Sequence, residues 1–186
     1  VKPGLQRALV HISGLGHFEL FLNGRKSGNN LLSPGWTKYD KTCLYETHDV
    51  TKLLRRGDNA VGITLGNGMY NSIGGGRYTK FKGSFGGQKA VAQIRLEYAD
   101  GSTETFVTDA QWRMDDGPIT FGTVYGGEDF DARLVQRGWD APKFNDSKWR
   151  PAQIVSGPGG ELRGLSCSAP PLREIEVLKP VAITQL

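Results

Sequence analysis

The sequence predicts an all-β sandwich, and three of its features carry that prediction. Apolar and polar residues alternate with a period of two over many short segments, as they do along half-buried strands. Asn23-Gly24 and Asp100-Gly101 lie between such segments, and these pairs are the strongest short-range hairpin signals. Helical periodicity is almost absent along the chain. We therefore expect packed sheets without a helical layer.

The sequence predicts eight strands and one short helical turn. Asp49 or Thr51 can cap that turn, and the apolar, β-branched segment 60–65 indicates a buried strand. Residues 66–87 are rich in glycine and lack periodicity, which favours a long loop whose aromatic residues pack on the body. The expected strands cover residues 8–13, 17–22, 43–50, 60–65, 90–98, 103–108, 152–155 and 172–178.

The composition argues against two classes of protein. Of the 186 residues 38% are hydrophobic, and no apolar run approaches the ~20 residues of a membrane-spanning helix. The 23 Lys and Arg residues outnumber the 19 Asp and Glu residues, but they are scattered rather than gathered into the stripe that nucleic-acid binding needs. We expect no membrane and no nucleic-acid partner. The length suits one core, so a single domain over residues 1–186, taken from a longer polypeptide, is expected.

The two cysteines give no sign of a metal site. Cys43 and Cys167 lie far apart, without CxxC spacing or a nearby histidine pair, so a metal–thiolate centre is not expected. The sequence leaves open whether they are free or form one disulfide.

The residues give little support to catalysis by this chain. Glu128, Asp129 and Asp131 could supply the paired carboxylates of a glycosidase. On one strand, however, Asp129 and Asp131 would share a face while Glu128 points to the other. Arg133 also offers an ion-pair explanation. There is no Gly-x-Ser-x-Gly nucleophile motif. A structural or ligand-orienting role of these carboxylates is therefore favoured over catalysis.

Carbohydrate binding fits the polar and aromatic loops best. Sugars are bound by aromatic faces together with hydrogen bonds from Asp, Asn and Arg side chains. The loop at residues 28–36 combines amides with an indole and is the leading candidate, whereas Trp112 and Trp149 are expected to close the ends of the core. Calcium is a second expectation, because irregular loops supply its oxygen ligands. The candidate calcium ligands are Asn29, Asn30 and Asp40, or alternatively Glu128, Asp129 and Asp131. The candidate sugar contacts are the aromatic residues Trp36, Tyr39, Tyr70, Tyr78, Tyr125 and Trp139 and the polar residues Asn29, Asn30, Asn67, Asn71, Arg77 and Glu128.

Several motifs in a fixed order resemble one known family. They read LVHISGLGHFELFLNGRKSGNNLLSPGWTKYDKTCLYETHDVTKLL, RRGDNAVGITLGNGMYN, ITFGTVYGGEDFDARL and FNDSKWRPA. Together, over about residues 8–171, they resemble the N-terminal β-sandwich domain of bacterial α-L-rhamnosidases of glycoside hydrolase family 78. That domain type is classed with the rhamnose-binding modules of carbohydrate-binding module family 67. The resemblance implies a jelly-roll-like antiparallel β-sandwich in which calcium helps to hold L-rhamnose.

The resemblance also implies a function and partners. The inverting catalysis of those enzymes takes place in a separate (α/α)6 barrel, so this chain is expected to be a non-catalytic module that binds L-rhamnose or rhamnosylated glycans. A structural domain that docks on the barrel, through residues 66–87 and 125–133, is the alternative. Asn29 stands where the family carries an aspartate, which weakens the attraction for a divalent ion. A periplasmic or secreted location is favoured. The implied sugar contacts are Asn29, Asn30, Trp36, Tyr70, Arg77, Glu128 and Asp131, with Asn29 and Asn30 as calcium ligands.

Overall fold

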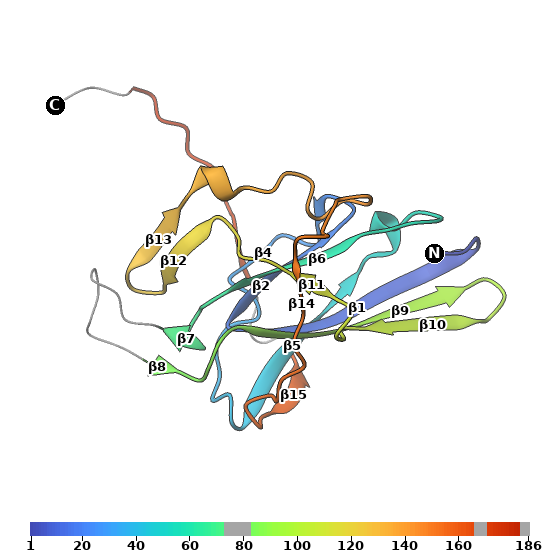
Figure 1. Ribbon diagram of the computed structural model, residues 1–186, viewed down its shortest axis with the longest axis horizontal. Helices are drawn as coiled ribbons and strands as arrows, with labels where there is room; N and C mark the ends of the chain where they lie inside the picture. Colours follow the sequence, from blue (N-terminus) through green and yellow to red (C-terminus); the bar gives the residue numbers. More distant parts are fainter. Residues whose placement is uncertain (73–82, 166–170, 183–186) are drawn as a thin grey trace.

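Two β-sheets enclose the hydrophobic core in this computed structural model, which describes residues 1–72, 83–165 and 171–182 (Figure 1). The larger sheet contains, in spatial order, β10 (Thr103–Val107), β9 (Lys89–Tyr98), β1 (Leu5–Leu15), β5 (Thr42–Asp49) and β15 (Glu161–Gly164). The smaller sheet contains β3 (Arg25–Lys26), β2 (His17–Leu22) and β6 (Val61–Gly66). Neighbouring strands are antiparallel, except that β15 runs parallel to β5. The predicted antiparallel β-sandwich is confirmed apart from this edge, and the jelly-roll-like topology stays a prediction.

Short ladders and turns complete the described fold. Two 3-10 turns, η1 (Thr51–Leu53) and η2 (Ala132–Leu134), are its helical elements, and no helix in the described ranges is long and apolar enough to cross a membrane. The N-cap of η1 is Val50, without a side-chain cap hydrogen bond, so neither Asp49 nor Thr51 is the cap that the sequence predicted. The Asp49 carboxylate accepts a hydrogen bond from the backbone N–H of Thr51 at 3.0 Å. The two-stranded ladders pair β4 (Asn30–Leu31) with β16 (Leu172–Arg173), β7 (Asn71–Ser72) with β8 (Gly83–Ser84), β11 (Arg113–Met114) with β14 (Arg150–Pro151), and β12 (Ile119–Thr123) with β13 (Gly127–Phe130).

The core forms because alternate residues of a strand point to the same side of its sheet. Val10 and Ile12 of β1 are completely buried, as is Leu22 of β2, and Leu20 is 1% exposed. They meet alternate residues of β9 and β6 in a single cluster. The period-two pattern therefore predicted both the strands and their inward faces. The other members of this cluster include Ala8, Phe18, Val50, Ala92, Ile94, Leu96 and Tyr98.

Asn23 and Gly24 form the two-residue turn between β2 and β3, as predicted. Their φ angles are 54° and 80°, the left-handed values that a type I′ turn requires. The Asn23 side chain also ties the turn to the segment before β6. Its Nδ2 donates to the carbonyl of Leu53 and to Oδ1 of Asn59, both at 2.8 Å, and its Oδ1 accepts from the backbone N–H of Ala60 at 3.0 Å. One residue thus fixes the hairpin and its attachment.

Replacing Asn23 by alanine is expected to lower the free energy of unfolding by about 1–2 kcal/mol, because the change removes these hydrogen bonds and disfavours a positive φ. Asn23→Gly keeps the turn conformation and loses only the side-chain bonds, so it should recover part of that loss. Urea denaturation of the two variants and the wild type measures the difference. Equal stability of all three proteins would contradict this account of the turn.

The second hairpin is confirmed with a different loop length. Ala99, Asp100 and Gly101 connect β9 to β10, closed by a hydrogen bond from the backbone N–H of Tyr98 to the carbonyl of Ser102 at 3.0 Å. Gly101 alone takes a positive φ, of 81°. This is the geometry of a three-residue loop with glycine in the left-handed position.

One strand prediction is wrong, and two others are confirmed only in part. Residues 152–155 form no strand, and the ladder there ends at Pro151. The strand expected over 172–178 is limited to β16, because the residues after it have no partner strand among the described residues. β6 is a strand but only half-buried. In the expected 66–87 loop, β7 and β8 form a short ladder, and residues 73–82 lie outside the described residues.

Candidate functional site

Residues 27–36 form the loop that follows β3 in the chain, and two backbone hydrogen bonds connect this loop to β2. The backbone N–H of Ser27 donates to the carbonyl of Leu20 at 2.7 Å, and that of Phe18 donates to the carbonyl of Ser33 at 2.9 Å. Between these ties β4 pairs with β16. The leading candidate loop is therefore attached to the core sheet on one side and to the C-terminal segment on the other.

Polar side chains of this loop, β5 and β16 form a network in which Ser27 and Glu46 are buried and Arg173 is exposed. Asn30 Nδ2 donates to Glu46 Oε2 at 3.1 Å, while Arg173 Nε donates to Asn30 Oδ1 at 3.5 Å. His48 Nε2 lies 3.2 Å from the same Glu46 oxygen, and its Nδ1 is 3.1 Å from the Ser27 hydroxyl. The amide of Asn30 thus presents its donor to a carboxylate and its acceptor to a guanidinium. This arrangement fixes the orientation of the amide.

Glu46 is an anion with little solvent access. The residue is 5% exposed, and Oε1 is buried without a hydrogen bond among the described residues. Burial alone raises the pKa of this carboxyl, but polar contacts with His48, Ser33 and Asn30 outweigh it and lower the pKa below its ordinary value. Glu46 is therefore charged at neutral pH, and its role is to position Asn30 and His48.

The lowered pKa of Glu46 makes a pH dependence of stability predictable. A depressed folded-state pKa adds stability that is present above the ordinary glutamate pKa and is lost as the pH falls through the folded value. Glu46→Gln should lower the free energy of unfolding at neutral pH by about 1–3 kcal/mol, because a charged acceptor of buried hydrogen bonds is removed. Its stability should then fall less steeply than that of the wild type as the pH falls below the ordinary glutamate pKa.

Chemical denaturation across this pH range measures both effects. Glu176→Gln is the matched control, because Glu176 is exposed and should leave the wild-type profile unchanged. Parallel pH profiles for Glu46→Gln and the wild type would contradict a role for the Glu46 charge.

The outer surface of the loop is apolar and aromatic as well as polar. Trp36 and Leu32 are each 60% exposed and Leu31 is 43% exposed. Asn29 is exposed and Asn30 is half-buried. Trp36 is thus a surface side chain. The loop places an indole and two amides at the solvent boundary, which is the combination that carbohydrate recognition uses.

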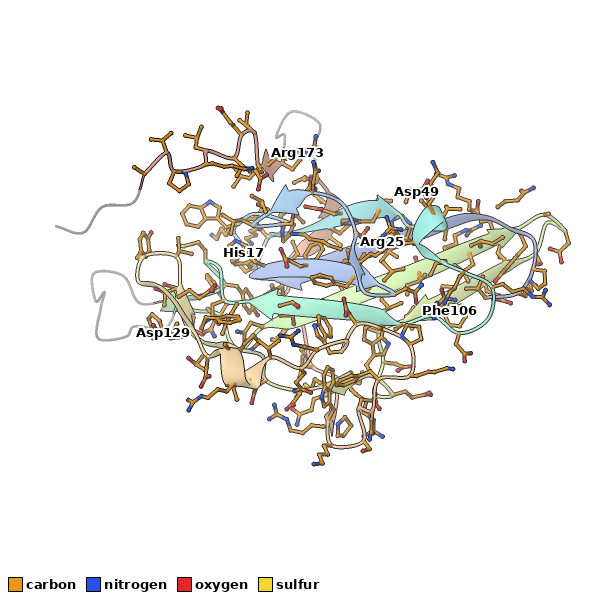
Figure 2. All side chains as sticks on the ribbon, turned by 90° about the horizontal axis from the view of Figure 1, so that it is seen from above. His17, Arg25, Asp49, Phe106, Asp129 and Arg173 are labelled. Atoms are coloured by element: carbon orange, nitrogen blue, oxygen red, sulfur yellow. The ribbon has the colours of Figure 1, made fainter. Side chains whose placement is uncertain are left out.

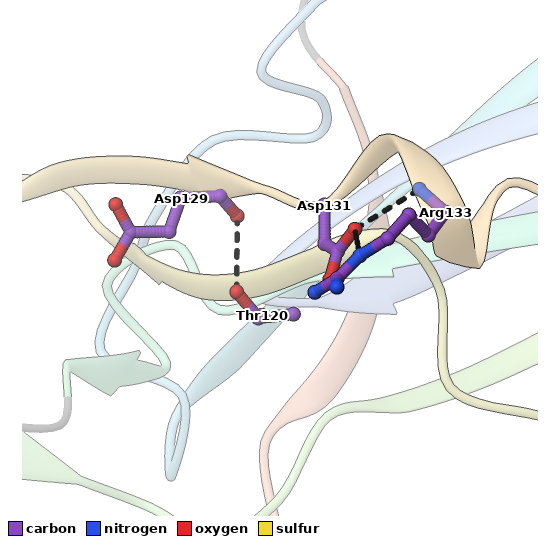
Figure 3. A network of polar contacts seen from close by, with 4 residues as sticks. All are labelled: Thr120, Asp129, Asp131 and Arg133. Atoms are coloured by element: carbon purple, nitrogen blue, oxygen red, sulfur yellow. Dashed lines mark hydrogen bonds and ion pairs between the residues drawn. The ribbon is translucent and has the colours of Figure 1, made fainter.

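The second group of predicted residues lies on the β12–β13 hairpin. Asp131 follows β13 and caps η2, and its carboxylate accepts from the backbone N–H and from Nε of Arg133, both at 2.9 Å (Figure 3). This confirms the expected ion pair with Arg133. The guanidinium and the backbone hydrogen bond lower the pKa of Asp131. Thr120 donates to the backbone carbonyl of Asp129 at 3.5 Å, and Glu128 is exposed.

The predicted sugar contacts do not converge on one point. Arg173, which contacts Asn30, and Asp129 of the β12–β13 hairpin lie well apart on the molecule (Figure 2). Tyr70 is completely buried, and its hydroxyl donates to the carbonyl of Phe85 at 3.1 Å. Arg77 lies outside the described residues. The loop at 27–36 is therefore the place where several predicted contacts, Asn29, Asn30 and Trp36, come from one segment.

Comparison with known families agrees with this fold. The family model for the alpha-L-rhamnosidase N-terminal domain matches residues 4–176. The chain belongs to this family. The matched range extends slightly beyond the residues 8–171 that the sequence motifs indicate.

Relatives of this α-L-rhamnosidase N-terminal domain are much longer proteins. An alpha-L-rhamnosidase of Formosa agariphila is 33% identical over 185 residues, which are 95% of this chain and 19% of the relative. The structure of an alpha-L-rhamnosidase from Dictyoglumus thermophilum matches 98% of this chain and 19% of its own, with 40% identity and a TM-score of 0.85. A Streptomyces avermitilis alpha-L-rhamnosidase, solved in complex with L-rhamnose, covers 86% of this chain and 16% of its own, with 34% identity and a TM-score of 0.79. The chain spans about a fifth or less of the length of these relatives.

Sequence reasoning missed three residues that matter to the candidate site of this rhamnosidase domain. Glu46 and His48 sit on β5 and Arg173 on β16, and each reaches the loop from a distant part of the chain. One sequence signal could have found Glu46: it is a carboxylate within the predicted strand 43–50. A charge that becomes buried in a strand needs a polar partner. Cys43, on the same strand, is free and buried, and Cys167 lies outside the described residues.

Proposed function

We infer that this domain is a non-catalytic carbohydrate-recognition module that binds L-rhamnose, or a rhamnosylated glycan, on the loop at residues 27–36. The observation that carries the inference is the fixed amide of Asn30, held between the buried Glu46 carboxylate and Arg173. A polar group that is oriented before binding loses less freedom when a ligand arrives. Each end of the amide retains a further hydrogen-bonding position for a sugar hydroxyl.

The exposed apolar side chains of the loop support a deoxy sugar as the ligand. L-rhamnose carries a methyl group where hexoses carry a hydroxymethyl group, so one corner of the ring is apolar. Trp36, Leu31 and Leu32 offer apolar surface beside Asn29 and Asn30, and an aromatic face stacks on C–H groups of a sugar. The complex of the Streptomyces avermitilis relative with L-rhamnose supports the same ligand class.

The ion pair of Asp131 with Arg133 argues against a role of Asp131 as a catalytic acid. A glycosidase needs one carboxyl group with a raised pKa, so that it can donate a proton to the leaving group. The pKa of Asp131 is lowered by Arg133, so this carboxylate does not meet the requirement for the proton donor. We therefore expect no release of rhamnose from an aryl rhamnoside by this chain alone, and measurable release would overturn the non-catalytic assignment.

The loop offers the type of oxygen ligand that calcium binds, but it offers too few of these oxygens. Calcium is held by roughly six to eight oxygen atoms. Glu46, Asn29 and Asn30 would supply carboxylate and amide oxygens, but Asn30 Oδ1 already lies 3.5 Å from Arg173 Nε. Within residues 1–72, 83–165 and 171–182, no group of three or more His, Cys, Asp or Glu side chains could hold a metal ion. The calcium expectation stays a prediction.

Calorimetric titration with L-rhamnose, in the presence of calcium and in the presence of a chelator, tests the proposed function. We expect saturable heat in the millimolar range. L-mannose differs from L-rhamnose only by a hydroxyl on the methyl carbon, so it is the matched control and should bind more weakly. The absence of heat from L-rhamnose under both conditions would overturn the binding function.

A structural role in docking is the second candidate, and the same surface favours it. Leu31, Leu32, Trp36 and Leu172 are all at least 43% exposed, and interfaces between domains bury such side chains. The expected partner is the (α/α)6 catalytic barrel of the same polypeptide. Under this alternative the isolated chain gives no heat with L-rhamnose, so the titration separates the two candidates.

A further inference from the structure

A groove of about 1040 Å³ runs along the open side of the sandwich, between the edge strands β6 and β10. Its walls come from β6, β9 and β10, from the segment 57–60 before β6, and from the segments 109–113 and 139–149. Phe106, on β10, marks this side of the molecule in Figure 2 and is 53% exposed. No residue of the loop at 27–36 lines the groove. It is therefore separate from the site proposed above.

One wall of the groove is a fixed aromatic layer. Trp139 packs over Gly62 of β6 so closely that a Cβ there would come within 2.5 Å of the indole. Trp139 stacks with Trp149 at a centroid distance of 6.4 Å, and Phe144 meets Trp149 edge-on at 5.5 Å. Trp139, Phe144 and Trp149 are all partly exposed. The rings hold one another in place, so the groove is lined by aromatic surface that is positioned before any ligand binds.

The polar lining of the groove favours an uncharged ligand rich in hydroxyl groups. Arg113 and Lys143 offset two of the three carboxylates of Asp58, Asp109 and Asp146, so the net charge of these side chains is small and neither an anion nor a cation is strongly attracted. Carboxylates and a guanidinium are also the groups that hydrogen-bond pairs of neighbouring hydroxyls. Together with the aromatic wall, they form the lining expected of a carbohydrate site.

The edge of β10 is less suited to adding a peptide strand. Thr108 N–H bonds to β9, so the peptide groups of Val107 face away from β9. The carbonyl of Val107 accepts from the indole N–H of Trp112 at 3.3 Å. An added strand would need this acceptor. The groove is thus better matched to a ligand that uses side-chain contacts.

We propose that this groove is a second carbohydrate-binding site, which takes several consecutive pyranose rings of a neutral glycan. Its volume exceeds what a single ring fills. The rings would stack on the aromatic wall while their hydroxyl groups meet Asp109 and Arg113. This proposal does not depend on rhamnose binding at the loop.

Tryptophan fluorescence can isolate this groove, because three of the four tryptophans line it and Trp36 does not. In a Trp36→Phe background, all indole emission comes from Trp112, Trp139 and Trp149. Titrations with cellotetraose, xylotetraose and mannotetraose are the probes. We expect a saturable emission change with at least one of these neutral tetrasaccharides. Adding Phe106→Ala or Asp109→Asn should weaken that binding by about tenfold or more.

Two controls keep the outcomes apart. Adding Asn30→Ala to the Trp36→Phe background should leave the tetrasaccharide affinity unchanged, because Asn30 lies outside the groove. Circular dichroism and urea denaturation show that Phe106→Ala and Asp109→Asn remain folded. No saturable change with any of the three tetrasaccharides, or a change that both groove variants leave intact, would overturn the proposal, whatever the loop does with L-rhamnose.

Discussion

Leu20→Ala is expected to lower the free energy of unfolding by about 2–5 kcal/mol, the largest stability effect that we predict for one substitution. Leu20 is 1% exposed and lies on β2, the central strand of the smaller sheet. Its side chain belongs to the cluster that joins β2 to β1 and β9, so truncation leaves a cavity between the two sheets. The same strand carries both ties of the loop at 27–36. Loss of core packing therefore also weakens the support of the candidate site.

Leu162→Ala is the matched control for this substitution. Leu162 lies on the edge strand β15 and is 51% exposed, so its removal should change stability by about 0.5 kcal/mol or less. Denaturant unfolding followed by intrinsic fluorescence gives both values. Similar losses for the two leucines would contradict the assignment of the core.

Asn30→Ala is expected to weaken L-rhamnose binding by roughly tenfold to a hundredfold, which corresponds to the loss of a well-placed hydrogen-bonding group. The substitution removes the amide that Glu46 and Arg173 orient. Calorimetric titration with L-rhamnose measures the change. Since Asn30 is half-buried on a surface loop, the fold itself should persist, and circular dichroism verifies this.

Gln6→Ala is a suitable comparison, because Gln6 is an exposed side-chain amide on β1. It should bind L-rhamnose like the wild type. If Asn30→Ala bound the sugar as tightly as Gln6→Ala does, the sugar contacts would have to lie elsewhere than in this network.

Local signals predicted most of the sandwich. The turn at Asn23-Gly24 and the hairpin around Asp100-Gly101 depend on backbone preferences of adjacent residues, and both form as expected. The prediction of a strand over 152–155 was wrong. The apolar residues of this segment resemble those of a strand, but a strand also needs a neighbouring strand to pair with, and the local pattern does not show whether one is present. Ile154 is 74% exposed, so the apolar character of that segment does not reflect core packing.

The candidate site was predictable only in part, because its support comes from distant residues. Asn30 and Trp36 were found through the composition of one loop. Glu46 contacts this loop from β5, and Arg173 lies 143 positions after Asn30 in the sequence. Sequence periodicity contains no information about such pairs. The aromatic groove was missed for the same reason, since Trp112 and Trp149 were expected to close the ends of the core.

Mapping of backbone amide shifts by NMR during titration with L-rhamnose tests the central claim most directly. We predict that the shifted signals cluster in residues 28–36 and on β5 around Glu46, next to the network that holds Asn30. Signals from the groove segments 106–113 and 139–149 should stay unchanged with this monosaccharide. Shifts confined to the groove, or no shifts at saturating sugar, would contradict the claim that this loop is the rhamnose site.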